Sequence, residues 1–114
     1  MEFGMFAEFP IRPGMTHADA FEESFRLVET AEQAGMDSVW LAEHHFRPEM
    51  SVLASPLLVA SAIASRTSRI KVGLAVQMLP LANLLRAAEE AATLDHICKG
   101  RFEYGIGRSG MTNY

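Results

Sequence analysis

A regular alternation of strand-like and helix-like segments constrains this chain more than any other feature. Four short apolar runs begin at residues 2, 37, 70 and 101, which lie 31 to 35 residues apart. That spacing accommodates one β-strand, one crossover helix and their loops. The runs are EFGMFAE (2–8), DSVWLAE (37–43), IKVGLAVQM (70–78) and RFEYGIG (101–107). The alternation predicts a parallel sheet with right-handed crossovers.

Start and stop signals predict a helix in each interval between these runs. Thr16 and Asp19 have the spacing of a capping box, and Ser55 precedes a proline in the manner of an N-cap. Gly35 and Gly100 are expected to end the first and third helices in the left-handed conformation. The helices are expected over about 17–34, 56–66 and 83–99.

Two architectures are compatible with this alternation of strands and helices. A doubly wound sheet can be completed in little more than 114 residues, and one domain is the expectation for that length. A (β/α)₈ barrel needs roughly 250 residues, so four strand–helix units would be half of one. The periodicity by itself does not choose between the two.

Composition excludes several classes of partner. The net charge is −4 and the ten Lys and Arg residues form no run, which argues against nucleic acid and anionic membranes as partners. The single cysteine, Cys98, allows no internal disulfide and fits a reducing compartment. Glu2 stands where an export signal would be positive, and no apolar run approaches the ~20 residues of a membrane span. We expect a cytoplasmic protein.

The segment EHHFRPE, after the second predicted strand, is the chemically densest loop of the chain. In extended backbone the adjacent His44 and His45 point in opposite directions, so at most one faces a given site. Neighbouring histidines lack the i, i+4 spacing of a zinc motif, and no cysteine or carboxylate cluster completes a ligand set. The sequence therefore predicts no metal site.

A G-x-G-x-x-G pattern follows the fourth strand-like run, at Gly105, Gly107 and Gly110. A dinucleotide-binding turn also needs a following helix and an acidic residue about 20 positions on, and only residues 111–114 follow here. Glycines at a strand end also occur where a ligand or another backbone comes close.

Three segments carry a resemblance to a known family: AGMDSVWLAEHHF (34–46), VGLAVQMLP (72–80) and LDHICKGRFEYGIGRS (94–109). Together, in order and in register, they resemble the bacterial luciferase-like family of flavin-dependent monooxygenases. The resemblance implies a (β/α)₈ TIM-barrel fold, with residues 1–114 forming about the first four βα units, the N-terminal half of that barrel domain.

The resemblance also implies an activity. Members of the family use reduced FMN, supplied by a separate NAD(P)H:flavin reductase, and O₂ to oxygenate a small organic substrate through a flavin C4a-hydroperoxide. Relatives that use a deazaflavin are the alternative within the family. A non-enzymatic alternative is an inactive fragment that only self-associates as a half-barrel.

The resemblance assigns roles to five residues. His44 corresponds to the catalytic histidine, and Ala75 and Val76 to a non-proline cis peptide beneath the flavin ring. Gly107 lies at the strand end beside the flavin, where light-emitting members carry a reactive cysteine. Arg108 corresponds to the arginine that contacts the flavin phosphate, which makes the G-x-G-x-x-G match a coincidence of composition.

A half-barrel would leave two unpaired sheet edges and an apolar concave face, so we expect a homo-oligomer. Alternate strand residues are the candidates for that concave face: Phe3, Met5, Val39, Leu41, Val72 and Leu74.

Overall fold

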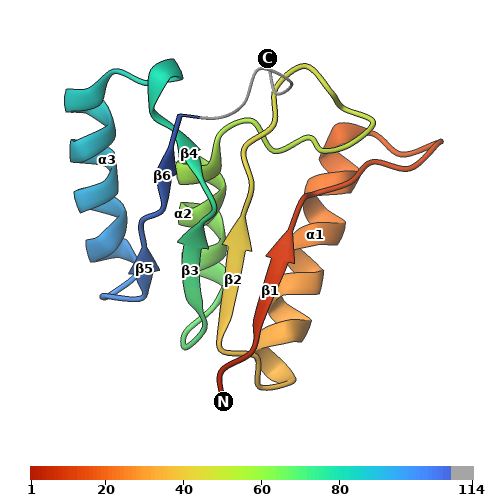
Figure 1. Ribbon diagram of the computed structural model, residues 1–114. Helices are drawn as coiled ribbons and strands as arrows, with labels where there is room; N and C mark the ends of the chain where they lie inside the picture. The colour runs from red at the N-terminus through yellow and green to blue at the C-terminus, as the bar shows by residue number, and fades with distance from the viewer. Residues whose placement is uncertain (109–114) are drawn as a thin grey trace.

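Four parallel strands form the main sheet, in the order β1-β2-β3-β5 (Figure 1). They are β1 (Gly4–Ala7), β2 (Ser38–Leu41), β3 (Lys71–Leu74) and β5 (Phe102–Glu103). Two further strands, β4 (Gln77–Met78) and β6 (Ile106–Gly107), pair with each other in parallel. This is a computed structural model that describes residues 1–108, so Gly110 and the rest of 109–114 lie outside the described residues. The parallel pairing and sequential order confirm the predicted strand–helix units.

The helices begin and end close to the predicted positions. They are α1 (His17–Gln33), α2 (Pro56–Arg66) and α3 (Leu84–Ile97), with a short 3₁₀ helix, η1 (Leu79–Leu81), before α3. Thr16 and Asp19 form the predicted reciprocal capping box, whereas Ser55 occupies its N-cap position without a side-chain hydrogen bond. Gly35, directly after the C-cap of α1, has φ of 92°, as predicted. At the end of α3 the first left-handed residue is Lys99, with φ of 54°, and Gly100 follows it with φ of 81°. None of the helices within residues 1–108 is long and apolar enough to cross a membrane.

The third and fourth predicted strands are each divided in two, which the sequence did not indicate. Between β3 and β4 the Ala75–Val76 peptide bond is cis, as the family resemblance implies. Between β5 and β6 the chain passes so close to β3 that a Cβ at Gly105 would lie 2.0 Å from the carbonyl oxygen of Leu74. Gly105 is thus required by a close approach of two backbones.

The predicted assignment of the concave face was wrong. Val39, Leu41, Val72 and Leu74 are fully buried in the core cluster, which also contains helical residues such as Ile63. Met5 packs against the same cluster, and Phe3 precedes β1 and is exposed. A period of two tells which residues share a face, but in a parallel sheet both faces are apolar, so the pattern does not tell which face meets the helices.

The face of the sheet opposite this core carries the intervening residues of each strand. Phe6, Trp40 and Gly73 are register partners across β1, β2 and β3. Figure 1 shows α1 and α2 on the far side of the sheet, behind the strands. The Phe6 side chain is 56% exposed on the open face.

Candidate active site

The residues to which the family resemblance assigns roles lie, together with Glu8, at the carboxyl ends of neighbouring strands. Glu8 follows β1, His44 follows β2, and the Ala75–Val76 peptide follows β3. Arg108 follows β6 at the same edge, toward which the strand arrows point in Figure 1. Because the strands are parallel and in sequential order, one edge of the sheet collects all of these groups.

His44 has a largely buried imidazole beside a carboxylate. Its side chain is 13% exposed, and its Nε2 lies 3.6 Å from Oε1 of Glu8, too far for a hydrogen bond. Nε2 is inaccessible to solvent and has no hydrogen-bond partner among the described residues. The backbone N–H of His44 donates to Leu53 at 3.0 Å, which ties this loop to the segment before α2. A buried ring nitrogen without a partner is costly, and it is suited to a polar ligand at this edge.

Val76 and Gly107 are in contact at the next pair of strand ends. A Cβ at Gly107 would lie 2.8 Å from Cγ2 of Val76, so the lack of a side chain lets β6 approach the residue after the cis bond. Met78 and Gly107 are register partners in the β4–β6 pair. The structure thus brings together two of the predicted cofactor residues, with His44 at the end of β2, the strand next to β3.

Arg108 is exposed and lines a cavity of about 640 Å³ at the end of β6. The other lining residues are Leu79, Pro80, Ala82, Leu84, Ile106 and Gly107. The cavity combines apolar walls with one guanidinium, a group that forms paired hydrogen bonds with phosphate oxygens.

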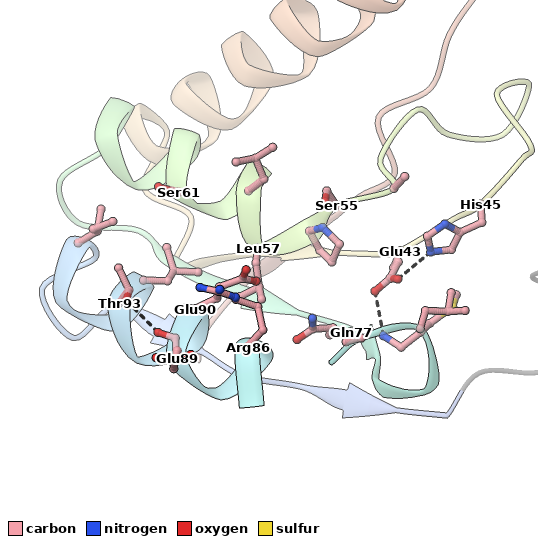
Figure 2. Close-up of a pocket in the computed structure, with 18 residues that line it drawn as sticks. Glu43, His45, Ser55, Leu57, Ser61, Gln77, Arg86, Glu89, Glu90 and Thr93 are labelled. Atoms are coloured by element: carbon pink, nitrogen blue, oxygen red, sulfur yellow. Dashed lines mark hydrogen bonds and ion pairs between the residues drawn. The ribbon is translucent and has the colours of Figure 1, made fainter. Parts of the chain in front are cut away.

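Glu43 is a buried residue of this region to which the sequence analysis gave no role. It is 8% exposed, and its carboxylate contacts both Nε2 of His45 (2.7 Å) and the backbone N–H of Met78 (2.8 Å). These contacts border a second cavity, of about 660 Å³, between α2 and α3 (Figure 2). The alternation Val39, Leu41, Glu43 was the available signal, because it continues the core-facing positions of β2 to a carboxylate two residues beyond the end of the strand.

His44 and His45 have different neighbours, as expected for adjacent residues in extended backbone. His44 faces Glu8, the residue after β1, whereas His45 faces Glu43 and the cavity between the helices. The hydroxyl of Tyr104 donates to Oε1 of Gln77, a residue that lines the cavity between α2 and α3. Burial, with smaller contributions from Glu90 and Glu43, raises the pKa of Tyr104, which keeps its hydroxyl a donor at neutral pH.

Metal-binding side chains do not gather anywhere in residues 1–108: no group of three His, Cys, Asp or Glu residues there could hold an ion. Cys98 is fully buried, and burial raises the pKa of its thiol above the ordinary value. The thiol therefore stays protonated and behaves as a small apolar side chain.

Similarity to known sequences is extensive. The family described as luciferase-like monooxygenase matches residues 1–113. The alkanal monooxygenase alpha chain of Photorhabdus laumondii is 35% identical over 113 residues, which is 99% of this chain and 31% of that protein. Limonene 1,2-monooxygenase of Rhodococcus erythropolis is 38% identical over 88 residues, or 77% of this chain and 22% of that protein. The chain thus spans about a third or less of the length of these relatives.

Solved structures agree with the sequence comparison. The oxygenating constituent of 3,6-diketocamphane monooxygenase from Pseudomonas putida, in complex with FMN, superposes with a TM-score of 0.89 at 27% identity. The match covers 96% of this chain and 30% of that one. Coenzyme F420-dependent tetrahydromethanopterin reductase of Methanopyrus kandleri superposes with a TM-score of 0.77 at 24% identity, over 98% of this chain and 28% of that one, which shows a shared fold.

These matches decide between the two architectures left open by the periodicity. The strands and helices are about the first four βα units of a (β/α)₈ barrel, and the doubly wound alternative is excluded. The chain belongs to the luciferase-like monooxygenase family.

Proposed function

We propose that residues 1–114 are the flavin-binding N-terminal half of a barrel domain whose activity is FMN-dependent oxygenation of a small organic substrate. The observation that carries this proposal is the buried Nε2 of His44 at the carboxyl edge of the sheet, which has no hydrogen-bond partner within residues 1–108. An unsatisfied polar atom at the edge where barrel enzymes bind their ligands calls for a ligand that supplies the missing partner.

The residues at this edge fit a flavin. Gly107 lines the same cavity as Arg108, and its lack of a side chain lets β6 pack against Val76, the residue after the cis bond. In this cavity the guanidinium of Arg108 suits the phosphate of FMN. When bound, the reduced flavin would supply the electrons and the reaction with O₂. In this proposal Ala75 and Val76 support the ring.

His44 would provide proton transfer. Histidine is the side chain whose ordinary pKa lies nearest neutral pH, so it can both accept and donate a proton during turnover. The 13% exposure of the imidazole limits exchange with bulk water. Glu8, 3.6 Å away, stands where it would stabilise the imidazolium after proton uptake.

FMN is favoured over a deazaflavin by the comparisons. The structure at 27% identity contains FMN, whereas the likeness to the F420-dependent reductase is of the fold alone. The same proposal includes a small organic substrate and a separate flavin reductase that supplies reduced FMN. It also includes a homo-oligomeric state and a cytoplasmic location. Limonene 1,2-monooxygenase among the relatives supports an organic substrate.

Flavin affinity tests the cofactor assignment. Replacing Arg108 with Ala is expected to weaken FMN binding much more than riboflavin binding, because riboflavin lacks the phosphate. Fluorescence titration with FMN, riboflavin and F420 measures the three affinities. Arg86→Ala, which removes an exposed arginine from α3, is the matched control. Equal losses for FMN and riboflavin would remove Arg108 from the phosphate site, and preferential binding of F420 would replace FMN by a deazaflavin.

Turnover tests the role of His44. In a preparation that oxidises reduced FMN, His44→Ala is expected to lower the rate about 10²–10⁴-fold, the usual contribution of a general acid or base. Flavin affinity should change little. His45→Ala is the control and should lower turnover less. If His45→Ala lowers turnover more than His44→Ala, proton transfer belongs to the other face of the loop.

A further inference from the structure

The side chain of Glu43 is buried, and its carboxylate makes two close polar contacts. Nε2 of His45 lies 2.7 Å from Oε1, and the backbone N–H of Met78 donates to Oε2 at 2.8 Å. Figure 2 shows both contacts, with Glu43 between the histidine and the chain that follows Gln77. Burial of a carboxylate costs free energy unless hydrogen bonds compensate for its lost hydration. The two contacts therefore fix Glu43 relative to His45 and Met78.

The contact with Met78 replaces a missing ladder bond. Up to Ala75, whose N–H donates to Leu41 at 2.7 Å, β3 bonds to the backbone of β2. Beyond the cis bond the chain turns away from β2, and the N–H of Gln77 donates to Gly105 on the other side, at 2.9 Å. The next N–H, that of Met78, therefore points back toward β2, where the Glu43 side chain is its acceptor.

Strand β4 is only two residues long, so its own backbone hydrogen bonds are few and the contact with Glu43 is a large share of what holds it in place. Its partner β6 is equally short, and their register pairs Met78 with Gly107. Val76, the residue before β4, contacts Gly107 of β6, and Arg108 directly follows β6. Whatever fixes Met78 therefore also fixes the backbone that presents Gly107 and Arg108.

We propose that Glu43, braced by His45, is a positioning residue for the cofactor site: it anchors β4 and, through the β4–β6 pair, sets the position of Gly107 and Arg108. The assignment rests on the proposed function, in that Gly107 and Arg108 are the residues said to meet the flavin. The two adjacent histidines then have separate roles: His44 transfers a proton at the carboxyl edge of the sheet, and His45 holds the carboxylate of Glu43.

Three substitutions at Glu43 test the assignment. Glu43→Leu removes the acceptor and is expected to weaken FMN binding about tenfold, in keeping with one lost buried hydrogen bond. Glu43→Gln keeps a carbonyl oxygen for Met78 and should stay within about threefold of the unmodified chain. In Glu43→Asp the shorter side chain cannot reach both partners, so FMN binding should weaken about as much as in Glu43→Leu. The aspartate variant therefore serves as the test if the leucine variant does not fold. Glu89→Leu, in an exposed position lining the same cavity, is the matched control.

Amide hydrogen exchange supplies a readout that needs no flavin. Glu43→Leu and Glu43→Asp should speed exchange at Met78 and Gly107 while leaving β1 and β2 protected, because the loss is local. Equal loss of protection in all strands would mean that Glu43 only stabilises the fold, and unchanged exchange together with unchanged FMN binding would also overturn the proposal. If the unmodified chain binds no flavin, the proposed function fails, and the exchange comparison still decides whether Glu43 anchors β4 and Gly107.

Discussion

The indole ring of Trp40 lies directly against the backbone of Gly73 on the neighbouring strand. A Cβ at Gly73 would lie 2.4 Å from Cε3 of the ring. On the other side, a Cβ at Gly4 would lie 3.2 Å from Nε1, whose N–H donates to Ser38 at 3.0 Å. One aromatic side chain therefore spans β1, β2 and β3 on the open face of the sheet, and the glycine on β3 makes room for it.

Replacing Gly73 with Ala should lower the free energy of unfolding by about 1–3 kcal/mol, because the added methyl group overpacks against the ring. Urea denaturation measures the change. Trp40→Leu should reduce the penalty when the two substitutions are combined, since the smaller side chain can move aside. Strictly additive losses in the double variant would show that the ring and the glycine do not oppose each other.

Arg101 is a second structural centre, where five hydrogen bonds join the end of α2, the loop that leads into β3 and the C-cap of α3. Its guanidinium donates to the carbonyls of Ala64, Thr67, Ile70 and Cys98 and to the Thr67 hydroxyl, at 2.9–3.3 Å. Arg101→Ala should lower the free energy of unfolding by about 3 kcal/mol, because the carbonyls lose their donors.

Arg101→Lys should recover only part of this loss, since an ammonium cannot reproduce the planar fork. Thermal and urea unfolding compare the variants. Arg26→Ala is the control: that side chain is 75% exposed and lies 3.6 Å from Glu22, so its loss should stay within about 0.5 kcal/mol. Equal effects of Arg26→Ala and Arg101→Ala would contradict the assignment.

Glu32 makes the fold sensitive to acid. Burial alone would raise the pKa of Glu32, but the backbone N–H groups of Ile70, Arg69 and Ser68, and the charge of Arg101, bring it below its ordinary value of 4.5. A carboxyl group whose pKa is lowered by folding stabilises the protein above its ordinary pKa, and this stabilisation is lost as pH falls through the lower native value.

The Glu32→Gln variant should therefore be less stable than the unmodified chain at pH 7, and the gap should close as pH falls below 4.5. Urea midpoints measured at a series of pH values from neutral to acid test this, with Glu89→Gln as an exposed control. A gap that stays constant over the whole series would mean that the ionisation of Glu32 does not contribute.

We expect residues 1–114, taken alone, to self-associate through the open face and edges of the sheet. β1 and β5 are the outer strands of the four-stranded sheet, and Phe6 on the open face is 56% exposed. Pairing of two such sheets would cover both edges and this face, so we expect a homo-oligomer at micromolar concentration.

Sedimentation of the chain measures its mass directly. Phe6→Ser should shift the population toward smaller species, whereas Leu27→Ser, on α1 and 57% exposed, should not. A compact monodisperse species near 12.6 kDa would show that the sheet needs no second copy.

Local signals in the sequence determined most of the fold. The spacing of apolar runs set the number and order of the strand–helix units, and cap residues such as Thr16 and Gly35 set the helix ends within a few positions. These features depend on interactions within a few residues along the chain, which is why a pattern of residue types suffices to find them. The motifs of 34–46, 72–80 and 94–109 identified the family for the same reason: each is a local run of residues.

Only the tertiary structure decided which face of each strand meets the helices, where the strands divide, and what a buried side chain touches. Val39 and Leu41 alternate in the same way whichever face is covered, because both faces of a parallel sheet are apolar. Gly105 is needed because the Leu74 carbonyl lies across from it, and Glu43 holds Met78 because β3 turns away from β2 after Ala75. These pairs are about 30 residues or more apart in the chain, and no local pattern records a distance between residues that meet only when the sheet forms.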